Sequence, residues 1–290
     1  MHQNKSVSKD FRSERSKLPA EAFAYAPGPE LPPQDLIEED LWREIISLPD
    51  DVMLRTSDHH GSELKAMNDI WGDWIESLGD EQDIVWNTML DSADELQACT
   101  FNSLCGYYRV AASCLRNVLE LSVIGTYFQL SSKNVEFDKW KRGEYEAKFG
   151  NACDYLIDHP SSKELDDHIG SRLDFSMFAK KPKNSWAGGL FRKLSDFVHS
   201  RPTRSAGIMW EGSNGPIYVT KSFGEIYALY LDTAALSYVL VKLARPKFGL
   251  PKAVKYIFGS RKVRPSKVAT YAFEFLWPRN TKSLRTNQMM

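Results

Sequence analysis

Apolar residues recur at helical spacing along most of the chain, and no other feature of the sequence limits the fold as strongly. Side chains three, four or seven residues apart share one face of an α-helix. The stretches 34–48 and 62–79 follow this spacing, and we predict a helix over each, the first closed by Pro49 and the second by Gly79. The apolar positions are Leu36, Ile37, Leu41, Ile45 and Leu48 in the first stretch and Leu64, Met67, Trp71, Trp74 and Leu78 in the second.

The same spacing predicts further helices as far as residue 244. A helix over 80–96 has acidic residues in its first turn, where the helix dipole favours them. The longest expected helix runs from about Phe101 to Gln129 and contains no proline. Shorter helices are expected at roughly 134–142, 145–157, 162–178 and 186–199, and a long one at about 222–244.

One segment breaks the helical pattern. In "MWEGSNGPIYV", residues 209–219, two short apolar runs flank a Gly-Ser-Asn-Gly turn, which is typical of a β-hairpin. Strands do not alternate with helices, and the glycine loops GxGxxG and GxxxxGKS/T that bind nucleotide phosphates are absent from the sequence. The expected fold class is therefore mostly all-α, a helical bundle with one small β-hairpin near 208–219.

Composition shifts divide the chain into four predicted parts. Residues 1–34 have low hydrophobicity and clustered prolines and are expected to form a flexible arm. An acidic helical region follows at 35–98, a helical bundle at 99–245 and a basic tail at 246–290.

Charge is distributed unevenly along a chain whose net charge is −1. Residues 30–100 hold 19 acidic and three basic residues, whereas residues 246–290 hold ten Lys or Arg and one acid, Glu274. Either the two regions pair with each other, within the fold or across a dimer, or the basic tail faces RNA or DNA. A protein partner bound through acidic 35–98 or basic 246–290 fits the same distribution.

The sequence predicts a cytoplasmic protein with no membrane partner. Its four cysteines lack metal-ligand spacing and no secretory signal precedes them, so we expect reduced thiols, mostly in the core. They are Cys99, Cys105, Cys114 and Cys153. The most apolar stretch, 223–244, contains Glu225, Asp232 and Lys242, which favours a buried helix over a membrane span.

Two expected helices carry a narrow row of polar residues between apolar ones. The rows are Arg109, Ser113, Arg116 and Glu120 on the earlier helix and Arg192, Ser195, Asp196 and His199 on the later one. In the plainer interpretation each row is the solvent-exposed face of an amphipathic helix. Arg116 and Glu120 then form a salt bridge that stabilises the helix by about 0.3–0.5 kcal/mol. In the other interpretation the two rows line a shared cleft, since apolar neighbours leave little exposed surface on either helix.

His199 is the residue in these rows most suited to acid–base chemistry. It ends its expected helix, where the dipole and the nearby Asp196 favour the protonated ring. Arg192, Arg201 and Arg204 oppose protonation, so we expect the ring to titrate near neutral pH. Such a ring suits general acid–base catalysis or a hydrogen bond to phosphate.

The stretch "RKLSDFVHSR", residues 192–201, fits the Arg-x(4–6)-His motif of the HEPN families, with six residues between Arg192 and His199. The stretch "YYRVAASCLRNVLELSVIGTYF" at 107–128, followed by "FDKWKRGE" at 137–144, also resembles bacterial HEPN-like proteins. Several such proteins are linked to phage defence. The resemblance therefore suggests a role in phage defence or in a toxin–antitoxin system. It covers about residues 100–240.

The resemblance implies a metal-independent endoribonuclease that acts on RNA as a homodimer, without a cofactor. By this resemblance, His199 acts on the ribose 2′-OH or the leaving oxygen, and Arg192 binds the charge that develops on the phosphate. The other expected binding residues are Ser195, Asp196, Arg116, Glu120, Arg109 and Arg201. Active members often have Asn, Asp or His directly after the arginine, whereas this sequence has Lys193.

A second function class stays open at this point. Many HEPN-like domains are non-catalytic, so the alternative is a helical module for dimerisation or for binding a nucleotide, a nucleic acid or a protein. A metal site has little support, because no HExxH or similar spacing occurs. His159 and His168 are isolated, and the pair at 59–60 lies in the loop-like segment "SDHHG".

Overall fold

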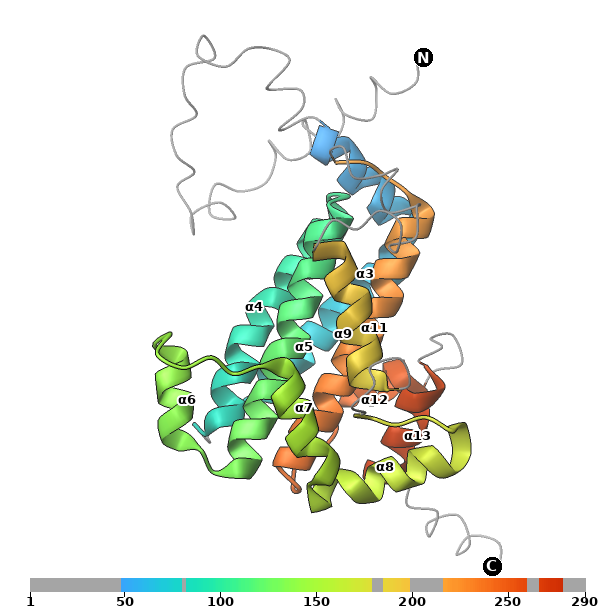
Figure 1. Cartoon of the computed structure of the whole chain (residues 1–290). Helices are drawn as coiled ribbons and strands as arrows, with labels where there is room; N and C mark the ends of the chain where they lie inside the picture. Colours follow the sequence, from blue (N-terminus) through green and yellow to red (C-terminus); the bar gives the residue numbers. More distant parts are fainter. Residues whose placement is uncertain (1–47, 80–81, 179–184, 199–215, 260–265, 279–290) are drawn as a thin grey trace, which may run out of the picture.

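The computed structural model describes residues 48–79, 82–178, 185–198, 216–259 and 266–278. The ten helices in these ranges are α3 (Leu48–Glu76), α4 (Ile84–Leu104), α5 (Tyr108–Ser131), α6 (Asn134–Lys141), α7 (Phe149–Asp158), α8 (Pro160–Leu173), α9 (Trp186–Val198), α11 (Thr220–Ala244), α12 (Lys252–Gly259) and α13 (Lys267–Leu276) (Figure 1). The predicted all-α class is confirmed for this part of the chain, where one isolated bridge, Ser176 to Ser185, is the β-structure present.

The predicted hairpin near 208–219 is not confirmed. Residues 208–215 lie outside the described ranges, and residues 216–219 form no strand. The predicted arm at 1–34 lies outside these ranges too, as does the first predicted helix apart from Leu48.

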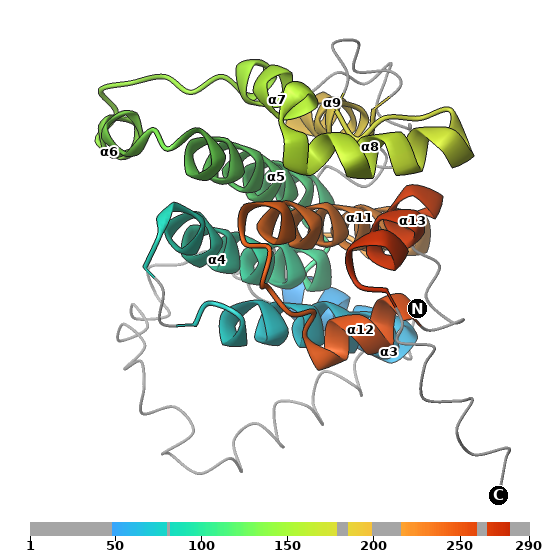
Figure 2. The same cartoon turned by 90° about the horizontal axis from the view of Figure 1, so that it is seen from below.

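α5 and α11 run in the same direction through the middle of the bundle. At their starts the Val219 backbone N–H donates to the Tyr108 hydroxyl over 3.1 Å, and further along the hydroxyls of Ser122 and Ser237 are hydrogen-bonded at 2.8 Å. Seen from below, α7, α8 and α9 lie on one side of this pair, and α3 and α12 lie on the other (Figure 2). The core therefore has helices on both faces of its two central elements.

α11 matches the prediction of a buried apolar helix at 222–244. Within the described ranges it is the one helix that is long and apolar enough to cross a membrane, with a mean hydropathy of 1.4 over its most apolar window. Of that window, 78% is buried inside the bundle. Its apolar character is thus accounted for by packing against the neighbouring helices.

The long helix predicted from Phe101 to Gln129 is wrong at its start. α4 continues to Leu104, and a new helix begins at Tyr108. Between them Gly106 has a positive φ of 80°, and a Cβ at this position would come within 2.4 Å of the Ile217 carbonyl oxygen. Only glycine fits both the left-handed conformation and this close approach, so the chain turns here.

Two expectations for α3 also need correction. Pro49 does not close a helix but lies in the first turn of α3, where a missing N–H costs nothing. The segment "SDHHG" is helical rather than a loop, although His60 departs from helical geometry with φ −131° and ψ 25°. At this kink the His60 ring stacks on Phe223 of α11, with centroids 4.2 Å apart, and its Nε2 lies 3.2 Å from the Tyr218 hydroxyl.

The shorter helices lie close to their predicted positions. α6 agrees within one residue, α7 begins at Phe149 instead of 145, and α8 spans Pro160–Leu173 instead of 162–178. α8 ends because Asp174 takes a left-handed φ of 49°. The segment that follows α8 is held by Asp166, which accepts hydrogen bonds from the Ser176 hydroxyl and the Met177 N–H.

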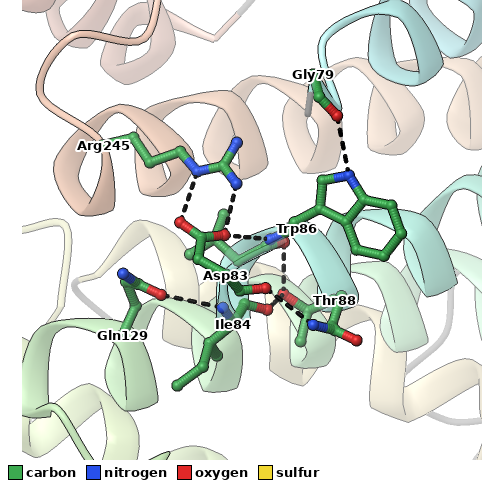
Figure 3. A network of polar contacts seen from close by, with 9 residues as sticks. Gly79, Asp83, Ile84, Trp86, Thr88, Gln129 and Arg245 are labelled. Carbon is green, nitrogen blue, oxygen red and sulfur yellow. Dashed lines mark hydrogen bonds and ion pairs between the residues drawn. The ribbon is translucent and has the colours of Figure 1, made fainter. Parts of the chain in front are cut away.

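A polar network ties the start of α4 to the ends of α5 and α11 (Figure 3). Asp83 caps α4 by accepting from the Trp86 N–H at 2.8 Å, and it forms a two-point ion pair with Arg245 at 2.9 and 2.5 Å. The Gln129 side-chain oxygen accepts from the Ile84 N–H at 3.2 Å. Both ion-pair side chains are largely buried, at 12% exposed for Arg245 and 24% for Asp83.

The acidic and basic regions do meet within the fold at the start of the tail. α12 packs on α3, and Asp73 of α3 accepts from the Val254 N–H at 2.8 Å. One core contains buried side chains from the predicted acidic region, bundle and basic tail, such as Met67, Leu119 and Ala272. The boundaries at 98 and 245 stay predictions. All four cysteines are free and buried, as predicted.

Candidate functional site

The candidate site is the seam between α5 and α9, the two helices that carry the polar rows. α9 forms because its apolar residues fall on one face and because the Ser185 hydroxyl accepts from the Gly188 N–H at 3.2 Å, which caps its first turn. The buried positions are Trp186, Ala187, Leu190, Leu194 and Phe197. This apolar face packs on α5 and α11 (Figure 1).

α9 runs in the opposite direction to α5. The Arg116 guanidinium of α5 lies over the Phe191 ring, whereas Lys193, two residues later, reaches Glu225 near the start of α11. α5 and α11 start at the same end of the bundle, so α9 runs towards the end at which α5 begins (Figure 1). The last turn of α9, with Ser195 and Asp196, therefore approaches the end of the bundle where α5 begins.

Arg116 is the best-defined residue of the seam. Its guanidinium carbon is 4.9 Å from the Phe191 ring centroid, and Phe191 stacks on Phe149 of α7 at 4.0 Å. Its Nη2 is 3.5 Å from Glu120, so the predicted intrahelical salt bridge is present. A guanidinium held over an aromatic ring and paired with a carboxylate is oriented by both partners, which lowers the entropy that it loses on binding an anion.

Each of the two polar rows has a donor that is buried without a partner among the described residues. These are Nε of Arg116 and the hydroxyl of Ser195. A buried donor that lacks an acceptor costs roughly 1–3 kcal/mol, so each favours an incoming acceptor. Arg109 lies one to two turns before Arg116 and is half-buried, with its carbonyl accepting from the Ser113 hydroxyl at 3.0 Å.

The polar row of α9 is partly open to solvent. Arg192 is exposed, and Ser195 and Asp196 are half-buried. Arg192 makes no ion pair with another described residue, whereas the neighbouring Lys193 is paired with Glu225 at 3.0 Å. Predicted site residues His199 and Arg201 lie outside the described residues. The structure thus brings the two helices of the rows together, and a cleft shared by the rows stays a prediction.

Asp232 is a residue of this region that the sequence did not assign to the site. Burial in α11 raises the pKa of its carboxyl group, while hydrogen bonds from the hydroxyl and backbone N–H of Ser266 and the charge of Lys193 lower it. The carboxyl group thereby anchors the start of α13 close to α9. One feature of the sequence could have indicated this role: Asp232 is an acidic residue within the most apolar stretch of the chain.

The described residues contain no group of three or more His, Cys, Asp or Glu side chains that could hold a metal ion. His159 instead caps α8, where its Nδ1 accepts from the Ser161 N–H at 3.3 Å. His168 packs its ring against Phe275 of α13. The seam itself offers guanidinium and hydroxyl donors, from Arg116 and Ser195, which suit a phosphate or carboxylate.

Comparison of the chain with protein-family models, curated proteins and solved structures found no match. The fold defines the class as an all-α helical bundle, and the function rests on the site itself.

Proposed function

We propose that the chain is a cytoplasmic, homodimeric HEPN-like endoribonuclease that cuts RNA without a metal ion, in phage defence or as a toxin. The observation that carries the proposal is the position of Arg192. It is exposed on a helix whose opposite face is buried, and it makes no ion pair with another described residue. Because the helix fixes its backbone and its guanidinium is open to solvent, this side chain is suited to bind a phosphodiester.

The proposed reaction is a transesterification within the RNA backbone. The ribose 2′-oxygen forms a bond to phosphorus and the bond from phosphorus to the 5′-oxygen breaks, which leaves a 2′,3′-cyclic phosphate. His199 takes the proton from the 2′-hydroxyl, and the partner subunit's copy of that histidine gives a proton to the leaving 5′-oxygen. Arg192 stabilises the charge that builds on the phosphate oxygens.

In this proposal the seam supports the catalytic residues from below. Arg116 of α5 and Ser195 of α9 offer buried donors, and Glu120 and Phe191 hold Arg116 in place. In this proposal the donors of Arg116 and Ser195 bind the RNA backbone next to the cleaved phosphate. Arg109, Asp196 and Arg201 complete the binding set.

The test is cleavage of total RNA by the purified protein, read as cyclic phosphate ends. We expect His199→Ala and Arg192→Ala each to lower the rate by roughly 10²–10⁴-fold, because each removes a group that acts in the transition state. The matched control is Arg55→Ala, which removes an exposed arginine from α3 and should cleave like the wild type. Wild-type protein that cuts no RNA, or a His199→Ala variant of full activity, contradicts the proposal.

One observation favours the second candidate function, a non-catalytic binding module. Lys193, which stands where active HEPN proteins often have Asn, Asp or His, is engaged by Glu225. In that case Arg192→Ala weakens ligand binding in a protein that never cleaves RNA. Thermal shifts with nucleotides, RNA and candidate protein partners would then identify the ligand.

A further inference from the structure

The outward face of α12 carries an exposed tyrosine between lysines. Val254 and Ile257 point into the core, and the Val254 N–H is fixed to Asp73 of α3. Because these contacts set the rotation of the helix, Lys252, Lys255 and Tyr256 lie on the opposite side and are all exposed. We call these three residues the α12 face.

Tyr256 is the most exposed large apolar side chain of the described residues, at 77%. An aromatic ring in this position contributes almost nothing to the core. Its neighbours are equally unused by the fold: Lys252 and Lys255 form no ion pair with any described residue. Lys252 also begins its helix, where the dipole disfavours a cation. None of these three side chains is placed for stability.

Pairing with the acidic region accounts for Arg245 at the end of α11 but not for the α12 face. Arg245 is bound to Asp83, and Lys242 donates to the carbonyl groups of Pro246 and Phe248. Asp73, the acid of α3 that meets α12, is occupied by the backbone of Val254. The lysines of the α12 face are left facing solvent, and the sequence around them holds no acid from 246 to 273.

We infer that the α12 face is a docking surface for single-stranded RNA, with Tyr256 stacking on a base and Lys252 and Lys255 binding the flanking phosphates. This inference rests on the proposal that RNA is the substrate. Lysines around an exposed aromatic ring are the combination that binds single strands without sequence preference, since every base has a stacking face. In duplex RNA the bases are stacked on one another, so an exposed aromatic ring finds no free base face to stack on.

The α12 face lies on the far side of the α5–α11 pair from α9 (Figure 2). It is therefore separate from the seam, and substitutions there leave the groups around Arg192 in place. The α12 face therefore helps to bind the RNA but takes no part in the chemical step. Loss of the α12 face should raise KM for RNA and leave kcat unchanged.

The experiment measures binding of a fluorescent, unstructured RNA of about twelve nucleotides by anisotropy over a series of salt concentrations. The full-length Arg192→Ala protein is the parent, so that the RNA stays intact. We expect Tyr256→Ala to weaken binding about tenfold and Tyr256→Phe to bind like the parent, since phenylalanine keeps the stacking ring. Lys252→Ala/Lys255→Ala should lower the slope of log K against log salt by about 1.4, the value for two phosphate contacts on a single strand.

The matched control is Lys139→Ala/Lys163→Ala, which removes two exposed lysines from α6 and α8 and should bind RNA like the parent. Equal losses in this pair and in the α12 pair would mean that only net charge matters, and would overturn the inference. Unchanged affinity of Tyr256→Ala, or tighter binding of anionic vesicles than of RNA, would overturn it as well.

The inference and the proposed function fail in different ways. Binding that depends on Tyr256 in a protein that never cleaves RNA removes the nuclease and keeps the docking surface. Cleavage whose KM is the same with and without the α12 face keeps the nuclease and removes the docking surface.

Discussion

At the scale of single residues, burial sets the chemistry of the thiols. Burial raises the pKa of Cys114 and Cys153 to about 12 and that of Cys105 to about 11, and it raises the pKa of Cys99 as well. A thiol reacts through its thiolate, so these groups are protected both by exclusion of reagent and by protonation. We expect no cysteine to react with Ellman's reagent at pH 8 in the folded protein and all four to react in denaturant. A fast-reacting thiol in the folded state would contradict the described packing.

A second prediction at this scale concerns Asp232. Since burial raises the pKa of this carboxyl group in the folded state, the folded protein binds its proton before the unfolded chain does as pH falls. The destabilisation caused by the buried charge is therefore greatest at neutral pH and shrinks as pH falls through the raised pKa. Asp232→Asn should be at least as stable as the wild type at pH 7 and lose this advantage near pH 4.

Chemical denaturation at several pH values tests this expectation. Asp91→Asn, an exposed position on α4, is the control and should shift the free energy of unfolding little at either pH. A stability advantage of Asp232→Asn that grows towards low pH would contradict the sign.

At the scale of elements, the turn between α4 and α5 depends on one glycine. Gly106→Ala places a Cβ against the Ile217 backbone and forces a side chain into the left-handed region. We expect a loss of about 2 kcal/mol or more in the free energy of unfolding. Gly224→Ala is the matched control: no atom lies within 4 Å of its Cβ, and α11 should gain about 0.5–1 kcal/mol. Urea denaturation measures the stability of both variants. Equal stability would contradict the close approach of Gly106 to the Ile217 backbone.

At the scale of the whole molecule, the expected homodimer needs an apolar contact surface. Phe101, Val110 and Ile217 are 59%, 47% and 41% exposed and belong to the end of the bundle where α4 turns into α5. α9 ascends to this same end, so a two-fold axis there would bring two copies of the Arg192 row together.

Light scattering tests this arrangement. The wild type should be a dimer at micromolar concentration, and Phe101→Glu should be a folded monomer with little nuclease activity. Val135→Glu on α6, at a position 64% exposed, is the control and should stay dimeric. A wild-type monomer would argue strongly against the composite site.

The amino-acid sequence by itself determined the all-α class of the described residues, the faces of most helices and the Arg116–Glu120 pair. All of these depend on residues a few positions apart, which share a helical turn whatever surrounds it. Even the early helices at 62–79 and 80–96 were recognisable, because their apolar rows persist through several turns.

Only the tertiary structure decided the features that depend on distant residues. The break at Gly106 follows from Ile217, the kink at His60 is packed against Phe223, and the orientation of Arg116 follows from Phe191. Each partner lies tens to more than a hundred residues away, and helical periodicity carries no information about it. The same reason explains Asp232, whose role appears only when α13 begins beside it. Local spacing specifies helices, whereas packing decides where they end and which polar groups meet.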